Sequence, residues 1–202
     1  MIRPDTLVLA TRNPHKVSEI AALLSGIPVR VVSCLDLPGV PEVVEDAATL
    51  EGNAVKKAVA VLEATGLPSL ADDTGLEVAF LGGAPGVLSA RYAGRAHDWE
   101  ANNRKLLADL AGAPAAARRA AFRCVVALAA PGRPVRVAEG RTDGIILETP
   151  RGDAGFGYDP LFLPDGFRRS YAEMSAGEKN RVSHRGKALA AARGLIEDLF
   201  TP

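Results

Sequence analysis

Short apolar runs and amphipathic stripes alternate along the first third of the chain. Thr6 to Thr11 (TLVLAT) and Val29 to Ser33 are typical of buried strands, because each is a brief apolar run bounded by polar residues. Between them, apolar residues recur at the spacing i, i+3, i+4, i+7, at Val17, Ile20, Ala21 and Leu24. This pattern predicts a helix that starts near Pro14, with Asn13 as its N-cap.

Three further helices and a set of strands follow from the same reading. Helices are predicted from about Glu51 to Thr65, from Asp98 to Leu110, and from about His184 to Phe200. We expect Lys56 and Lys57 on the first of these helices to be solvated. The predicted strands are Leu76 to Leu81, Arg119 to Ala130, Pro134 to Glu139 and Gly140 to Leu147, the last three forming an antiparallel set with a hairpin at Pro131-Gly132-Arg133.

The stretch Ser69 to Arg91 contains two adjacent carboxylates, Asp72 and Asp73. Neighbouring side chains on an extended chain point to opposite faces, so only one of them faces a given site unless the chain bends. Gly75 would allow such a bend, because glycine has no Cβ. Carboxylates beside a hydroxyl suit a hard cation such as Mg²⁺. The alternative is an ordinary Asp-rich turn, in which the side chains cap their own backbone.

The first predicted helix begins directly after a strand and a polar turn. Helix N-termini of this kind bind anions, because backbone N–H groups point outward there. Lys16 would lie in the first helical turn and would reach a phosphate. The G-x-x-x-x-G-K pattern of a P-loop is absent. The alternative, an ordinary capped helix with a solvated Lys16, remains open on this segment alone.

Composition narrows the class of protein. The 202 residues carry 24 Lys+Arg and 24 Asp+Glu, so the net charge is zero, which argues against a general binder of nucleic acids or acidic membranes. The residues at the N-terminus lead directly into a strand, and no charge-free apolar segment reaches the roughly 18 residues of a membrane span. We therefore expect a cytoplasmic protein with one domain over residues 1–202, and buried free thiols at Cys34 and Cys124.

Five separated segments form a pattern that covers nearly the whole chain. They are Ala10 to Lys16 (ATRNPHK), Thr49 to Ala58 (TLEGNAVKKA), Ala71 to Gly94 (ADDTGLEVAFLGGAPGVLSARYAG), Gly155 to Phe162 (GFGYDPLF) and Glu178 to Ala188 (EKNRVSHRGKA). Together they closely resemble the inosine triphosphate pyrophosphatase family, also described as dITP/XTP pyrophosphatases. Each segment is weak alone, but five in this order are very specific.

The resemblance implies a fold, a reaction and an assembly. The fold would be an elongated, two-lobed α/β structure around a long mixed β-sheet flanked by helices, with a nucleotide cleft between the lobes. The reaction would be Mg²⁺-dependent hydrolysis of ITP, dITP and XTP to the monophosphate and pyrophosphate, which removes them from the nucleotide pool. The protein would be a homodimer, with no stable nucleic-acid partner and no membrane association.

The resemblance also implies roles for particular residues. Asp73 would be the general base and a metal ligand, and Glu45 the second metal-linked carboxylate. Thr74 stands where the family usually has Ser and keeps its hydroxyl. The remaining substrate contacts would come from the phosphate turn, from the base pocket, where Phe156 stacks on the purine, and from three further side chains facing the base. These residues are Thr11, Arg12, Asn13, Pro14, His15 and Lys16, then Phe156, Gly157, Tyr158 and Asp159, then Lys179, His184 and Arg185.

The chemistry is consistent with these roles. Cleavage of the α–β phosphoanhydride needs charge neutralisation and an oriented water, which a metal between carboxylates and phosphate supplies. Hypoxanthine and xanthine carry an acceptor oxygen at C6, whereas adenine carries a donor there, and Arg185 has only donors to offer. Guanine shares the 6-oxo group, so its rejection must come from the C2 side of the base.

The chain departs from the family pattern in one motif. The usual form is close to T-F-x-E-N-A, and here Leu50 replaces the aromatic residue and Gly52 the acid before Asn53. If that acid holds metal or water, Glu51 or Glu45 must replace it, or turnover drops. Two alternatives to the main hypothesis therefore stay open. One is a related pyrophosphatase with a different base preference, and the other is a nucleotide-binding module with little turnover.

Overall fold

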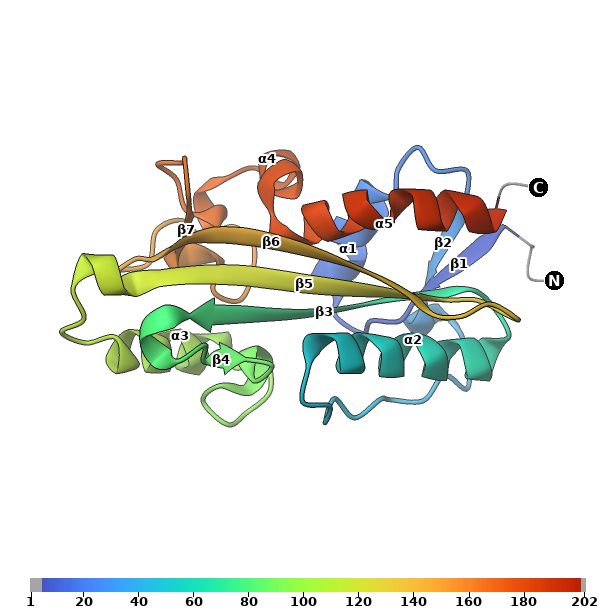
Figure 1. Ribbon diagram of the computed structural model, residues 1–202, viewed down its shortest axis with the longest axis horizontal. Helices are drawn as coiled ribbons and strands as arrows, with labels where there is room; N and C mark the ends of the chain where they lie inside the picture. The colour runs from blue at the N-terminus through green and yellow to red at the C-terminus, as the bar shows by residue number, and fades with distance from the viewer. Residues whose placement is uncertain (1–4, 201–202) are drawn as a thin grey trace. The chain divides into compact units, whose positions relative to one another are not determined.

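The computed structural model describes residues 5–200, and its helices and strands follow one another as Figure 1 labels them. Short 3₁₀ turns connect several of them. The elements are β1 (Thr6–Leu9), α1 (Pro14–Leu23), β2 (Arg30–Ser33), α2 (Leu50–Thr65), β3 (Ser69–Val78), β4 (Pro85–Gly86), α3 (Trp99–Asp109), β5 (Arg119–Ala129), β6 (Arg136–Ile146), β7 (Phe162–Pro164), α4 (Ala176–Val182) and α5 (His184–Phe200).

All strands belong to one mixed sheet, with the order β2-β1-β3-β5-β6-β7 and β4 paired to β3. β1 runs parallel to both of its neighbours, with Leu9 opposite Ser33 on β2 and opposite Leu70 on β3. β4 is antiparallel to β3, and β7 is antiparallel to β6. The predicted α/β class and the mixed sheet flanked by helices are confirmed.

The backbone contacts divide the chain into two compact units. The first unit consists of the chain up to Asp73, the stretch Cys124–Gly140, and the chain from Arg185 onward. The second consists of Thr74–Arg123 and Arg141–His184. The strands β3, β5 and β6 contribute residues to both. The single domain and the nucleotide cleft implied by the resemblance stay predictions.

The core of the first unit lies between the sheet and two helices. Apolar side chains of β1, β3 and β5 meet those of α1 and α5, which cover one face of the sheet, while α2 covers the other face (Figure 1). The fully or nearly fully buried members include Leu7, Leu9, Ile20, Leu70, Val126, Ala192 and Ile196. This packing fixes the start of α1 next to β3, where Asp72 and Asp73 lie.

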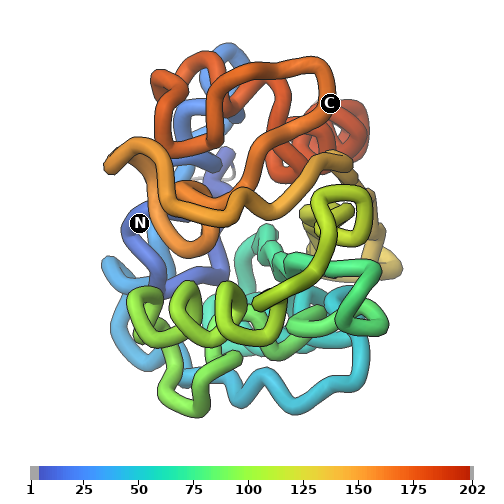
Figure 2. The backbone as a smooth tube through the Cα atoms, turned by 90° about the vertical axis from the view of Figure 1, so that its left-hand side faces the viewer, coloured from blue at the N-terminus to red at the C-terminus, as the bar shows by residue number. Residues whose placement is uncertain are grey.

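The core of the second unit is rich in aromatic rings. Phe122 packs edge-on against Phe162, with 4.8 Å between the ring centroids, and stacks on the His184 imidazole at 4.5 Å. Tyr171 is also fully buried in this cluster, together with Leu106 of α3 and its C-cap residue Leu110. The segment from 147 to 158 covers part of this unit as a winding backbone, gold to orange in Figure 2, and contains neither α-helix nor strand.

Some local predictions were wrong. β3 continues through Gly75 without a break, so the bend that this glycine would allow is not used, and Asp73 lies within the strand and not at its end. The two strands predicted from Pro134 to Glu139 and from Gly140 to Leu147 are the single strand β6. The sequence reading also missed the short helix α4. None of the helices within residues 5–200 has the length and apolar character needed to cross a membrane.

Candidate active site

The turn that was predicted to bind phosphate leads into α1, and the predicted helix start and N-cap are confirmed. Asn13 is the N-cap, and its Oδ1 accepts hydrogen bonds from the backbone N–H groups of His15 (2.9 Å) and Lys16 (3.4 Å). Thr11 Oγ1 accepts one from the Asn13 N–H at 3.3 Å. Asn13 therefore already occupies two of the N–H groups of the first turn. Attraction for an anion there comes from the helix dipole and from the Lys16 ammonium.

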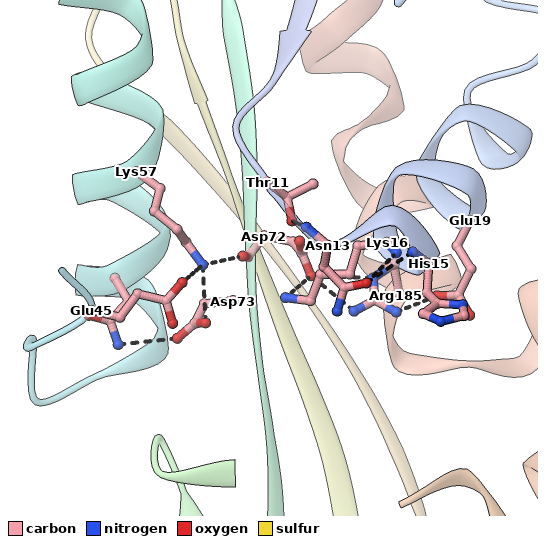
Figure 3. A network of polar contacts seen from close by, with 11 residues as sticks. Thr11, Asn13, His15, Lys16, Glu19, Glu45, Lys57, Asp72, Asp73 and Arg185 are labelled. Atoms are coloured by element: carbon pink, nitrogen blue, oxygen red, sulfur yellow. Dashed lines mark hydrogen bonds and ion pairs between the residues drawn. The ribbon is translucent and has the colours of Figure 1, made fainter. Parts of the chain in front are cut away.

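Asp72 and Asp73 point to opposite sides of β3, which confirms the alternation predicted for an extended chain (Figure 3). Asp72 points toward α1, where its Oδ2 lies 3.0 Å from Lys16 Nζ. The same oxygen accepts from Arg185 Nη2 at 3.0 Å, and Arg185 Nη1 contacts Glu19. The parallel register of β1 and β3 explains this meeting, because the turn after β1 ends beside the middle of β3.

Asp72 is fully buried and fully ionised. Burial alone would raise the pKa of its carboxyl, but the charges of Lys16, Arg185 and Lys57 outweigh burial and hold that pKa far below its usual range. Arg185 has an exposed fraction of only 2%. A buried carboxylate is stable only with such partners, so this cluster fixes the position of Lys16.

Asp73 faces α2 and shares a lysine with Glu45. Lys57 Nζ lies 3.2 Å from Asp73 Oδ1 and 2.7 Å from Glu45 Oε1, and it donates to the Asp72 carbonyl oxygen at 2.7 Å. Asn53 Nδ2 donates to Asp73 Oδ2 at 3.3 Å. Figure 3 shows this group on the opposite side of β3 from Lys16 and Arg185.

The electrostatics of the two carboxylates differ. Burial raises the pKa of Asp73 above its ordinary value, although the Lys57 charge works against this. For Glu45, burial also acts to raise the pKa, but the nearby Lys57 ammonium outweighs it and the net pKa is lowered. The pKa of Lys57 is itself raised, because the charges of Asp73 and Glu45 outweigh burial. Lys57 therefore stays protonated between them.

The expectation that Lys57 is solvated was wrong. Only 7% of Lys57 is exposed, whereas its neighbour Lys56 lies at the surface and pairs with Asp46 at 2.6 Å. Sequence reasoning missed Lys57 because its carboxylate partners are remote in the chain. One local signal was available: Asn53 and Lys57 are four residues apart and share a face of α2.

Asp73 and Glu45 provide the chemistry that a magnesium site needs. Mg²⁺ is usually held by one or two carboxylates together with substrate phosphates. Within the described part of the chain, no three His, Cys, Asp or Glu side chains are grouped so as to hold a metal on their own. The Lys57 ammonium lies between the two carboxylates, which shows that this position favours positive charge. The residues therefore fit a metal shared with a phosphate.

A second polar cluster lies in the second unit, around the predicted base pocket. Lys179 Nζ pairs with Asp159 Oδ2 at 2.5 Å, and both residues are buried. The same carboxylate oxygen accepts from the Phe156 N–H at 2.9 Å, and the Lys179 ammonium lies 4.9 Å from the centre of the Phe156 ring. Phe156 is half-buried, whereas Tyr158 is buried with its hydroxyl donating to the Ser89 carbonyl.

Other predicted residues make contacts within the protein that do not by themselves indicate a substrate. Arg12 Nη2 donates to the Val40 carbonyl at 2.9 Å and ties the phosphate turn to the connection that carries Glu45. His184 is buried against Phe122, and the Arg185 guanidinium is engaged by two carboxylates. The predicted contact of these two side chains with a purine stays a prediction, as does the substrate contact of Thr74.

The fold and the site define an α/β protein in which a strand bearing paired carboxylates passes beside a helix N-terminus. A profile of the Ham1 family matches residues 7–194, and the chain belongs to this family. The resemblance drawn from the five motifs is thereby confirmed.

Relatives with a stated activity and solved structures are similar to this chain over nearly its whole length. The dITP/XTP pyrophosphatase of Desulforamulus reducens is 50% identical over 96% of each chain, and that of Geobacter sulfurreducens is 52% identical over 91% of this chain and 92% of its own. A HAM1 protein from Coxiella burnetii has a TM-score of 0.86 with 37% identity, covering 96% of this chain and 98% of its own. A nucleoside-triphosphatase / dITP/XTP pyrophosphatase from Mycobacterium abscessus has a TM-score of 0.75 with 47% identity, covering 92% and 97%.

Proposed function

We propose that this protein hydrolyses dITP, ITP and XTP to the nucleoside monophosphate and pyrophosphate, with Mg²⁺ as its cofactor. The observation that carries the proposal is the pair Asp72 and Asp73. Asp72 holds Lys16 at the start of α1, and Asp73 faces a second carboxylate across Lys57. The relatives named dITP/XTP pyrophosphatase support the substrate class.

Different residues carry out different parts of the reaction. Lys16 and the N-terminus of α1 bind the polyphosphate, and Asp72 keeps Lys16 at that position. Glu45 and Asp73 would hold Mg²⁺, which would supply charge neutralisation on the polyphosphate. Asp73 takes a proton from the attacking water as the bond between the α and β phosphates breaks. A base at this position needs the carboxylate form, which the Lys57 ammonium beside it favours.

Base selection takes place at Phe156 and Lys179. The Lys179 ammonium, which has donors only, lies 4.9 Å from the centre of the Phe156 ring, where a stacked purine would be held. The 6-oxo group of hypoxanthine or xanthine accepts from such a donor, whereas the 6-amino group of adenine does not. Sites built on hydrogen bonds reject mismatched groups by as much as roughly 10⁴-fold. Discrimination against ATP follows.

We also propose a homodimer, following the motif resemblance, and a cytoplasmic location suited to surveillance of the nucleotide pool. Size-exclusion chromatography with light scattering tests the first. A monomer at micromolar concentration would contradict it.

The decisive experiment is hydrolysis of dITP, ITP, XTP, GTP and ATP with Mg²⁺, with and without a chelator, separating pyrophosphate from orthophosphate. We expect pyrophosphate from dITP, ITP and XTP, little from ATP, and none with chelator. Orthophosphate as the first product would contradict cleavage between the α and β phosphates.

The matched variant is Asp73→Asn, which keeps the shape of the side chain and removes the base. We expect hydrolysis to fall by at least about 10³-fold while nucleotide binding persists. Activity within a few-fold of the parent would show that Asp73 is not the base.

A further inference from the structure

The loop Gly155 to Asp159 has little regular structure of its own. Gly155 and Gly157 have φ values of +75° and +69°, a region that favours glycine, and the residues up to Tyr158 form neither α-helix nor strand. The orientation of the half-buried Phe156 ring therefore depends on contacts with other segments of the same unit.

One set of contacts comes from residues of the sequence motifs. The Asp159 carboxylate holds the Phe156 N–H and the Lys179 ammonium, and the Tyr158 hydroxyl donates to the Ser89 carbonyl at 2.9 Å. These contacts hold the loop at Phe156, Tyr158 and Asp159. None of these three contacts involves the peptide group of Gly157.

The second set comes from helix α3. Asn103 Nδ2 donates to the Gly157 carbonyl at 3.0 Å. Trp99 packs edge-on against two rings of the loop, with centroid distances of 6.3 Å to Phe156 and 5.9 Å to Tyr158. A Cβ on Gly157 would lie 3.7 Å from the Trp99 ring, so the loop backbone rests directly on the indole.

Trp99 and Asn103 are four residues apart and therefore share one face of α3. The helix that carries them is well anchored. Asp98 caps its N-terminus by accepting from the Ala101 N–H at 3.1 Å, and Leu106 and Leu110 are fully buried in the unit's core. α3 is thus a rigid support for two side chains that both contact the loop.

We infer that Trp99 and Asn103 are positioning residues for base recognition: they hold the Gly155–Asp159 loop so that the Phe156 ring is presented to the purine. The inference rests on the proposed function, because it takes Phe156 as the stacking residue. It adds helix α3, which none of the five motifs includes, to the residues that determine base specificity.

The first test measures KM and kcat for ITP and ATP in Asn103→Ala and Trp99→Ala. We expect KM for ITP to rise about 5- to 10-fold, the effect of losing one ordinary hydrogen bond or ring contact, with kcat within about two-fold. The ratio of kcat/KM for ITP to kcat/KM for ATP should decrease. Inhibition by inorganic triphosphate, which has no base, should not change.

Two further variants serve as controls. Trp99→Phe keeps an aromatic edge and should bring KM back to within about three-fold of the parent. Arg104→Ala lies on the exposed side of α3, where Arg104 contacts only Glu100 among the pairs described, and should match the parent. If Trp99→Ala does not fold, the KM and kcat values of Asn103→Ala still test the inference.

The second test uses Trp99 as a probe, since it is the single tryptophan of the chain. In the Asp73→Asn protein, ITP should change the tryptophan emission, whereas inorganic triphosphate should not. Calorimetric binding of ITP without any change in emission would overturn the inference.

Failure of the inference and failure of the proposed function give different results. A parent that hydrolyses ITP, with Asn103→Ala and Trp99→Ala both keeping its KM and its preference over ATP, overturns the role of α3 alone. A parent that releases no pyrophosphate from any of these nucleotides overturns the proposed function, and the inference with it.

Discussion

Asp72 and Asp73 are neighbours in the chain but have opposite electrostatic surroundings. Asp72 has two cationic partners and is held ionised, whereas burial raises the pKa of Asp73. The alternation of side chains along β3 separates the two, so one carboxylate holds Lys16 and the other faces Lys57 and Asn53. A single strand thus supplies both functions.

Lys57 gives the sharpest prediction at this scale, because Lys56 beside it is a natural control. Lys57→Met leaves the buried Asp73 and the half-buried Glu45 without their cation. We expect kcat/KM to fall at least about 100-fold and stability to fall by roughly 3 kcal/mol. Lys56→Met removes only an exposed pair and should change stability by less than about 0.5 kcal/mol.

Steady-state kinetics and urea unfolding of both variants provide the measurement. Equal effects from Lys56→Met and Lys57→Met would contradict the assignment of Lys57 to the site.

Sequence reasoning reached part of this site and missed the rest for a physical reason. The alternation at Asp72 and the cap at Asn13 are local, so the sequence alone predicts them. The place of Lys57 depends on carboxylates that are 12 and 16 residues away, and periodicity along α2 carries no information about such partners. Motif resemblance supplied Asp73 and Glu45, which spacing alone did not.

Among the elements, the long helices were predictable because caps and apolar stripes agree. The short helix α4 was missed, although Ser175 and Glu178 form a capping box that reads S-x-x-E in the sequence. β6 was divided in two because Gly140 and the polar side chains of one exposed face interrupt its apolar pattern. Long elements with a continuous apolar pattern were therefore predicted correctly, whereas a short helix and a strand with an interrupted pattern were not.

Gly52 can now be placed on its helix. Thr49 is the N-cap of α2, so Gly52 occupies the third helical position, where an acid completes a capping box. The acid that the family pattern has there is therefore explained by helix capping as readily as by metal binding. A Cβ on Gly52 would lie 2.8 Å from the Ala47 Cβ, which is too close without a shift of the backbone.

This contact reverses the usual effect of replacing glycine in a helix. We expect Gly52→Ala to destabilise the protein by about 1 kcal/mol, because of the overlap with Ala47. Gly194→Ala in α5, where no atom lies within 4 Å of the added Cβ, should instead stabilise it by about 0.5 to 1 kcal/mol. Urea denaturation of the two variants tests the contrast. An increase in the free energy of unfolding of both variants would refute the steric argument.

At the scale of the whole molecule, neither unit is a continuous piece of sequence. The first unit is assembled from three stretches, and its core needs β5 and α5 in addition to the N-terminal elements. Parallel pairing of β1 with β2 and β3 cannot bury Leu7 and Leu9 without these partners. The fold is therefore a property of the full chain.

A fragment of residues 1–73 tests this dependence. It contains β1, α1, β2 and α2 but lacks Val126, Ala192 and Ile196, which complete the core. We expect no cooperative thermal transition by circular dichroism, since the apolar faces of β1 and α1 would stay exposed. A fragment with a sharp transition of its own would contradict the expectation.

The late position of α5 also has a consequence for biosynthesis. At about 5 to 20 residues per second, the stretch between Leu70 and Ile196 takes between about 6 and 25 s to translate. Until then the nascent chain carries its N-terminal strand and helix without their covering helix, although the segments of the second unit have already been synthesised. Any product that stops before α5 would keep that apolar face exposed, and we expect chaperones and proteases to recognise such products.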